Sequence, residues 1–248
     1  MKTKLILVYL SFIVLHILFS KPPKEVQLGL SNLPAFQKFS NPLGCDKLGR
    51  DILSLYTYGT LSAILFSIPA RIFCLISVIF LNLLVFSLGR VAEVFMNGLS
   101  AVFISIPSFL LGLILVYSLG QSLFTFFIAI FFIDWATIYE TYQAKVSEIK
   151  LSNYVLASKL MGATKFFIFK KHILFEIFSL SKVLLITGIP SVIMTIAIFN
   201  FLGIDFGSDI FGPSLGEQIS FSKDFFDSSY LSLISPILGI LILLLLLS

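Results

Sequence analysis

The stretch Leu61–Leu88, "LSAILFSIPARIFCLISVIFLNLLVFSL", is apolar along its length except for Arg71 and Asn82. About 17 to 25 apolar residues are enough for a helix to cross the hydrocarbon layer of a membrane, so this run is longer than a bilayer requires. Pro69 and Arg71 interrupt it, and we expect its first turns to tilt or to lie along the membrane interface. The stretch therefore predicts a membrane-spanning helix.

The composition of the whole chain supports the same fold class. Of 248 residues, 58% are hydrophobic, 28 are Phe and only 12% are charged. One soluble core could not hide that much apolar surface, so most of the chain must have the lipid bilayer as its solvent. The formal net charge of +4 is small. We therefore predict an all-α, multi-pass membrane protein and exclude nucleic acid as a partner.

Five further apolar runs bring the predicted number of transmembrane helices to about six. They cover residues 4–20, 99–119, 122–138, 177–199 and 231–247. The run at 4–20 follows basic residues and also fits a secretory signal peptide, but "ILFSKPPKE" has no small-residue cleavage site, so we predict a retained anchor. In the run at 99–119, Pro107 predicts a kink, because neighbouring helices can satisfy the carbonyl that it frees.

The distribution of charge predicts the orientation of the spans. Between Glu140 and Lys182 the chain has seven lysines, which predicts a cytoplasmic loop. Residues 201–230 have one lysine against five acids, as expected of a translocated loop. With six spans, both termini would lie in the cytoplasm. The segment Lys21–Tyr56 would then be extracytoplasmic, although its five basic residues weakly favour the other side.

Two charged residues fall inside predicted spans and are candidate functional residues. These are Arg71 and Asp134, and an ionisable group at membrane depth is a functional candidate by default. For both residues the structural alternative is snorkelling to the membrane surface or packing against a neighbouring helix. A metal site is not expected, because His16 and His172 each lack a nearby second ligand and the two cysteines have no ligand spacing.

The lysine-rich stretch at 153–175, "NYVLASKLMGATKFFIFKKHILF", predicts two short helices joined by an elbow of small residues. Ser152 or Asn153 can cap the first helix, and Gly162 can end it with a positive φ. Thr164 can cap the second, which would place Phe166, Phe169 and Ile173 on one face. Such an elbow suits a shallow groove on another protein. Alternatively, the helices lie on the inner leaflet, with Phe in the acyl boundary and Lys on the headgroups.

This stretch resembles the cytoplasmic signature loop of ABC-importer permeases, whose pattern is Glu-Ala-Ala, three residues, Gly, nine residues and Ile-x-Leu-Pro. Ala157, Gly162 and Leu174 are in register with that pattern. Among the positions that depart from it, Leu156, Ser158 and Phe175 replace Glu, Ala and Pro.

Two further segments resemble blocks of the peptide and nickel importer permeases in particular. The segment from Asn41, "NPLGCDKLGRDILSLYTYG", is similar to their "HPLGTDxLGRDxLSRxxYG" block. The segment from Phe199, "FNFLGIDFGSDIFGPSLGEQI", is similar to their "LSFLGLGxxPPxPSWG" block, with Leu215 in place of Trp. The three blocks occur in the order and spacing of the family.

The resemblance implies a type I ABC-importer permease fold with a cytoplasmic coupling helix. Residues 1–56 would form an N-terminal transmembrane anchor and an extracytoplasmic segment, and residues 57–248 the permease domain, with the coupling loop at about 140–176. The residues that match or adjoin the signature and would contact the ATPase are Ala157, Ser158, Gly162, Ala163 and Leu174.

The resemblance also implies the partners. These are a sister permease subunit forming a heterodimer, two cytoplasmic ATP-binding subunits and an extracytoplasmic solute-binding protein. ATP and Mg²⁺ would be bound by the ATPase partners, so this chain would hold no cofactor and have no catalytic residues. It would be a subunit of the bacterial cytoplasmic (inner) membrane that carries peptides, with nickel or another small solute as the alternative cargo.

Two other classes of protein remain open. In a proton- or ion-coupled secondary transporter, Asp134 could relay a proton or bind the coupling ion. We find no second intramembrane acid and no paired broken half-helices that would favour such a carrier. A divergent, non-transporting membrane assembly subunit is the other alternative, and it leaves the three ordered blocks unexplained.

Overall fold

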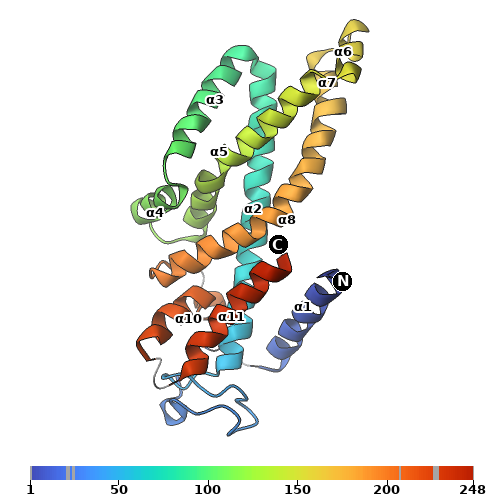
Figure 1. The fold of residues 1–248 in the computed structure, drawn as a ribbon. Helices are drawn as coiled ribbons and strands as arrows, with labels where there is room; N and C mark the ends of the chain where they lie inside the picture. Colours follow the sequence, from blue (N-terminus) through green and yellow to red (C-terminus); the bar gives the residue numbers. More distant parts are fainter. Residues whose placement is uncertain (1, 21–22, 24–25, 207, 226–228, 248) are drawn as a thin grey trace. The chain divides into compact units, whose positions relative to one another are not determined.

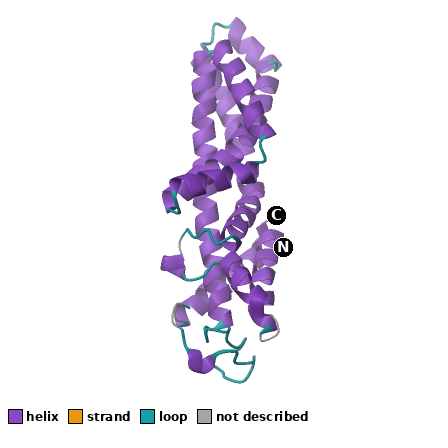
Figure 2. Cartoon of the chain, turned by 90° about the vertical axis from the view of Figure 1, so that its left-hand side faces the viewer, coloured by secondary structure: helices purple, strands orange, loops and turns teal. Residues whose placement is uncertain are grey.

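The computed structural model describes residues 2–20, 23, 26–206, 208–225 and 229–247, and over these the chain is mostly helical (Figures 1 and 2). The described residues contain two isolated β-bridges and no strand, so the all-α prediction is confirmed. The α-helices are α1 Lys2–Phe19, α2 Ile52–Leu88, α3 Arg90–Ser105, α4 Ser108–Leu119, α5 Leu123–Lys150, α6 Asn153–Leu160, α7 Lys165–Ile168, α8 Leu174–Phe201, α9 Ser208–Phe211, α10 Leu215–Ser222 and α11 Tyr230–Leu247. The described residues also form two 3₁₀ turns, Leu28–Leu30 and Lys223–Phe225, and a π-helical segment, Phe169–Ile173.

Four helices in the described part of the chain are long and apolar enough to cross a membrane. They are α2, α5, α11 and the continuous helix Phe166–Phe201. A fifth span results if α3 and α4, which are bent by 89°, count as one. The apolar helix at Lys4–Phe19 is shorter than these. A multi-pass membrane protein is therefore confirmed, whereas the predicted number of about six spans is not.

The two prolines have different effects on their helices. α2 continues through Pro69, and the tilt predicted for its first turns stays a prediction. The kink predicted at Pro107 is confirmed, in the form of a break between α3 and α4 with a bend of 89°. The residue before a proline is pushed out of the helical region, and Ile106 accordingly has the extended conformation with φ −86° and ψ 132°.

The chain divides into two compact units, and each is described by itself. Unit 1 consists of Met1–Pro69, Gln121–Leu123 and Ile189–Ser248, and unit 2 consists of Ala70–Gly120 and Phe124–Gly188. The long helices α2 and α8 contribute residues to both units.

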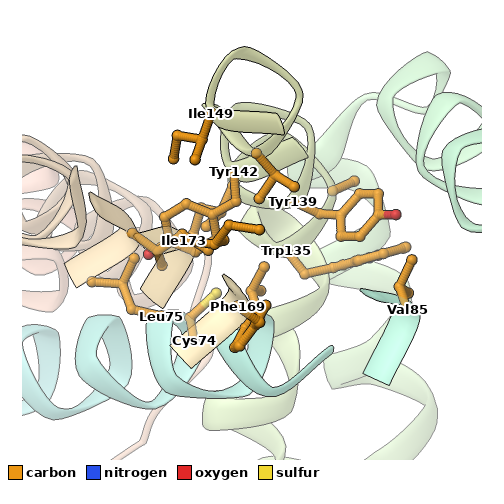
Figure 3. Packing of buried hydrophobic residues seen from close by; sticks show 14 of the residues in the cluster. Cys74, Leu75, Val85, Trp135, Tyr139, Tyr142, Ile149, Phe169 and Ile173 are labelled. Carbon is orange, nitrogen blue, oxygen red and sulfur yellow. The ribbon is translucent and has the colours of Figure 1, made fainter. Parts of the chain in front are cut away.

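Unit 2 has a buried core built mainly on one face of α5. Trp135, Tyr139 and Tyr142 are at most 3% exposed, and they pack with Cys74 and Ile173, as Figure 3 shows. Lipid tails are as apolar as these side chains, so close packing and hydrogen bonds, rather than removal from water, must hold such a core together. The hydroxyl group of Tyr142 accordingly forms a 2.6 Å hydrogen bond with that of Ser181.

Polar contacts attach α3 to α5 in the same unit. The hydroxyl of Ser100 donates to Glu140, and the hydroxyl of Tyr139 donates to Oδ1 of Asn97 over 3.1 Å. Gln143 in turn donates to the Tyr139 oxygen over 2.8 Å. These bonds give α3 a fixed register on α5.

In unit 1, hydrogen bonds hold α1 against α2. The hydroxyl groups of Tyr9 and Tyr56 lie 2.6 Å apart, and Nδ1 of His16 lies 3.0 Å from the hydroxyl oxygen of Thr57. Between them Ile13 is buried. His16, which had no role at the level of the sequence, therefore has a structural partner.

The loop that precedes α2 is organised around Asp46. Its carboxylate accepts hydrogen bonds from the backbone N–H groups of Leu48 and Arg50, both over 2.9 Å, and from Nε of Arg50 over 2.7 Å. Gly44 and Gly49 have φ values of +79° and +73°, and a Cβ atom at either would overlap a backbone carbonyl. Only glycine both adopts a positive φ readily and lacks a Cβ atom. This gives a physical reason for the glycines in the two Leu-Gly pairs of this block.

The segment after α8 is held by Gln218 of α10. Its side-chain amide donates to the carbonyls of Leu55 and Pro213 over 2.7 and 2.8 Å, and the residue is 3% exposed. Gly216 lies so close to the carbonyl of Ala197 that no side chain would fit. Leu215, which replaces the Trp of the resembling block, is buried at 2% exposure.

We expect the thiol of Cys45 to be unreactive in the folded chain. It is fully buried, and this burial, with smaller contributions from the charges of Asp51 and Asp46, raises its pKa from 9.0 to about 11. The thiolate is the reactive form, so maleimide should label Cys45 slowly at neutral pH and quickly after unfolding. Because the folded pKa lies above the unfolded one, this group should lose its stabilising contribution as pH rises from 9 to about 11.

The matched control is Phe39→Cys in the same loop, since Phe39 is fully exposed. The chain that reports on Cys45 would carry Cys74→Ala, and the control would carry both Cys74→Ala and Cys45→Ala, so that each has a single thiol. Equal labelling rates at positions 39 and 45 would contradict the buried position of Cys45.

Candidate functional site

The stretch predicted to form two short helices forms one, α6. The second predicted helix is the start of the long continuous helix Phe166–Phe201. α6 ends at Leu160, and Gly162 follows with a φ of +85°. The hydroxyl oxygen of Thr164 accepts a hydrogen bond from the backbone N–H of Phe167 over 3.2 Å and so caps α7. The elbow between the helices, predicted from the Gly162 and Thr164 signals, is thereby confirmed as a local structure.

The predicted face of the second helix is wrong at one position. Phe169 and Ile173 are buried, but Phe166 is 66% exposed and Ile168 takes its place in the core at 3%. The cause is the π-helical segment Phe169–Ile173, which has more residues per turn than an α-helix and rotates the faces on either side of it. A spacing of three residues therefore no longer marks a common face here.

The elbow presents large apolar side chains outward, which we call the elbow surface. Leu160 and Met161 are 90% and 83% exposed. The other members are Tyr154, Leu156, Phe166 and Phe167, all at least 44% exposed. Nothing in the described structure lies within 4 Å of a Cβ placed on Gly162, so the elbow has open space beside it. A partner could therefore approach the backbone closely at this point.

Contacts with the core of unit 2 and with the π-helical segment hold α6, and with it the elbow, in place. Val155 of α6 is fully buried, and the hydroxyl of Ser158 lies 3.2 Å from Nε2 of His172. The ring of Tyr154 lies 5.3 Å from that of His172. These contacts fix α6 on the π-helical segment, so the elbow surface has a defined shape.

The five residues predicted for the ATPase contact do not share one environment. Ala157 and Gly162 are exposed at the elbow, and Ser158 and Ala163 are partly buried. Leu174 packs against the core of unit 2 together with Ala163. Most of the exposed apolar residues were not among the residues predicted to make this contact. The sequence signal that could have indicated them is the apolar pair "LM" directly before the glycine that ends the helix.

Arg71 and Asp134, treated separately in the sequence, are partners. Nη1 of Arg71 lies 2.6 Å from Oδ2 of Asp134, and Nε and Nη2 donate to the carbonyl oxygen of Leu184 over 3.1 and 2.9 Å. The Arg71 side chain is only 7% exposed. We call this set of bonds, which joins α2, α5 and α8 within unit 2, the Arg71 clamp.

Gly188 makes room for the Arg71 clamp. A Cβ atom at this position would overlap the guanidinium group of Arg71. The clamp also bears on the secondary-transporter alternative, because a proton or coupling ion would have to compete with Arg71 for Asp134. No second acid is paired with Asp134 in the described part of the chain, and no group of three or more metal-binding side chains occurs there.

Fold and site together define a multi-pass, all-α membrane protein with a buried charge clamp and an exposed apolar elbow. Comparison with known proteins assigns it further. The family described as binding-protein-dependent transport system inner membrane component matches residues 79–248. The chain belongs to this family, as its three sequence blocks predicted.

Curated relatives agree with the family. The chain is 30% identical over 162 residues to the oligopeptide transport system permease protein of Bacillus subtilis, an alignment covering 65% of this chain and 53% of that protein. It is 28% identical over 189 residues to the dipeptide transport system permease protein of the same species, covering 75% and 58%. For the dipeptide permease of Haemophilus influenzae the identity is 29% over 231 residues, covering 91% and 77%. The matches to the first two relatives thus span little more than half of their length.

We expect removal of one member of the Arg71 clamp to destabilise the chain strongly. Arg71→Met or Asp134→Asn would leave its buried partner without its counter-charge, which typically costs about 3–5 kcal/mol. The double variant should lose less free energy of unfolding than the two single variants added together, because it leaves no unpaired charge. Unfolding of the purified chain in detergent would measure all three.

The control for the Arg71 clamp is the exposed ion pair of Lys145 and Glu148, also on α5. Lys145→Met should change the stability little, because exposed pairs are screened by solvent. Clamp variants no less stable than this control would show that the pair is not the contact that holds the three helices.

Proposed function

We propose that this chain is the transmembrane permease subunit of an ATP-driven ABC importer for peptides in a bacterial inner membrane. The observation that carries the proposal is the elbow surface, an exposed apolar surface on a well-anchored junction between two long helices. Family membership and the peptide permeases among the relatives support the cargo class. Nickel or another small solute is the alternative cargo.

In this proposal the elbow surface docks in a groove of a cytoplasmic ATP-binding subunit. Leu160 and Met161 would enter the groove, and the left-handed turn at Gly162 would allow close approach of the backbone. Leu156 stands where the family signature has Glu, so the contact would rest on apolar shape more than on charge. ATP and Mg²⁺ would be held by the ATPase, not by this chain.

Movement of the elbow would reach the membrane part of unit 2 through α5 and α8. Both helices lead from the elbow to the Arg71 clamp, α5 through Asp134 and α8 through Leu184. A contact shared by two proteins, each with two arrangements, is what coupling between distant sites requires. The Arg71 clamp would keep the helices moving together.

The remaining partners follow from the same proposal. A sister permease would complete a heterodimeric pathway, and two ATP-binding subunits would drive it. With both termini in the cytoplasm, the segment held by Gln218 would face the extracytoplasmic side and its solute-binding protein. The chain would have no catalytic residues of its own.

The elbow surface can be tested by Leu160→Glu. Because Leu160 is 90% exposed, the change should leave the fold intact while placing a charge in the ATPase groove. We expect co-purification of the ATP-binding subunit, and peptide uptake by the reconstituted importer, to fall by at least about tenfold, as for a hot-spot residue. Phe39→Glu, at a fully exposed position outside the elbow, is the matched control.

Gly162 allows a second comparison at the same elbow. Asn tolerates the left-handed conformation and Val does not, so Gly162→Asn should keep assembly while Gly162→Val should weaken it. Assembly and uptake that survive both Leu160→Glu and Gly162→Val would rule out the elbow as the coupling contact. Uptake by the chain alone, driven by a proton gradient and abolished by Asp134→Asn, would instead support a secondary transporter.

A further inference from the structure

A small cavity with an excess of positive charge lies beside the elbow in unit 2. Its volume is about 200 Å³, and we call it the basic pocket. The lining residues that matter here are Phe86, Gly89, Arg90, Glu93, Lys150 and Lys159. They come from the end of α2, the start of α3, the end of α5 and α6, four segments that the core of unit 2 holds together.

One of the three cations in the basic pocket is already neutralised. Nζ of Lys150 lies 3.1 Å from both carboxylate oxygens of Glu93 and 5.6 Å from the centre of the Phe86 ring. Arg90 and Lys159 form no ion pair within the described part of the chain, and both are exposed. Three cations against one carboxylate leave an excess of two positive charges.

The backbone adds to this positive field. α3 begins directly at Arg90, and Gly89 before it has a φ of +90° and no side chain to cap the helix. The first N–H groups of the helix therefore have no capping side chain, and they carry the positive end of the helix dipole, of which Glu93 in the first turn offsets a part. The lysine and arginine side chains and the start of α3 would favour the same ligand, an anion.

The surroundings of the pocket indicate the source of the anion. Leu88 and Val91, on either side of the turn at Gly89, are 73% and 85% exposed, and Phe95 one turn later is 67% exposed. Large apolar side chains next to a cation are typical of the boundary between acyl chains and headgroups. An anion reaching Arg90 at this boundary would belong to a lipid.

We propose that the basic pocket binds the phosphate group of an anionic phospholipid. Arg90 and Lys159 contact the phosphate, while the Lys150–Glu93 pair keeps the wall of the pocket in place. Since Lys159 belongs to α6 and Arg90 to α3, one bound lipid connects the elbow to α3. The proposal does not depend on the ATPase contact, because it concerns the chain alone in a membrane.

The test compares lipid binding by the full chain and by Arg90→Gln/Lys159→Gln. Each chain would be reconstituted in phosphatidylcholine vesicles doped with spin-labelled phosphatidylglycerol, and the fraction of immobilised label measured. We expect the preference for phosphatidylglycerol over phosphatidylcholine to be at least about fivefold lower in the double variant. Each basic residue near a membrane surface contributes about a fivefold factor to the binding of anionic lipid. Lys170→Gln, an exposed lysine on the π-helical segment outside the pocket, should keep the preference.

Three outcomes decide the proposal. The charge-preserving variant Arg90→Lys/Lys159→Arg should bind like the unmodified chain, and its failure to do so would overturn a site based on charge. An unchanged preference in the glutamine variant would overturn the pocket. Displacement of the labelled lipid by millimolar inorganic phosphate would identify a site for soluble anions instead of lipid. Thermal unfolding in phosphatidylcholine alone would show that every variant compared is folded.

Discussion

The Arg71 clamp is the contact on which unit 2 depends. A guanidinium group at membrane depth is stable only when its donors are satisfied, and here Asp134 and the carbonyl of Leu184 take that role. Bonds to a carboxylate and to a backbone oxygen are directional, unlike contacts between apolar side chains. In a lipid solvent, where apolar burial gives little preference for one arrangement over another, such bonds specify which helices are neighbours.

The constraint extends to the backbone around the clamp. Gly188 has to be glycine because the guanidinium group fills the volume of its side chain. Unit 1 uses the same principle with an uncharged group, since Gln218 reaches the carbonyl of Leu55 on α2 while Gly59 makes room for its amide. In each unit, one buried polar side chain and one glycine together fix how α2 packs against the helices that follow.

The sequence predicted the features that depend on local chemistry. Apolar length indicated the membrane helices, and Gly162 and Thr164 indicated the elbow because a positive φ and a side-chain cap are properties of single residues. Features set by packing between distant segments could not be predicted. Arg71 and Asp134 are 63 residues apart, and no periodicity shows which spans adjoin. Phe166 was misplaced because a π-helical segment has no reliable sequence signal.

The helices α5 and α8 connect the Arg71 clamp to the elbow. From Asp134 to the end of α5 at Lys150 is about 24 Å at 1.5 Å per residue, and from Leu184 back to the start of α8 at Leu174 is about 15 Å. α5 is regular over its stretch, whereas the π-helical segment Phe169–Ile173 separates α8 from the elbow and is a place where a helix can bend. A displacement at the elbow would therefore arrive at the Arg71 clamp mainly through α5. The directional bonds of the clamp would then resist a small shift and yield to a large one. Under the proposed function, this arrangement favours two discrete positions of the helices over a continuous range, which is what an ATP-driven cycle requires of its membrane subunit.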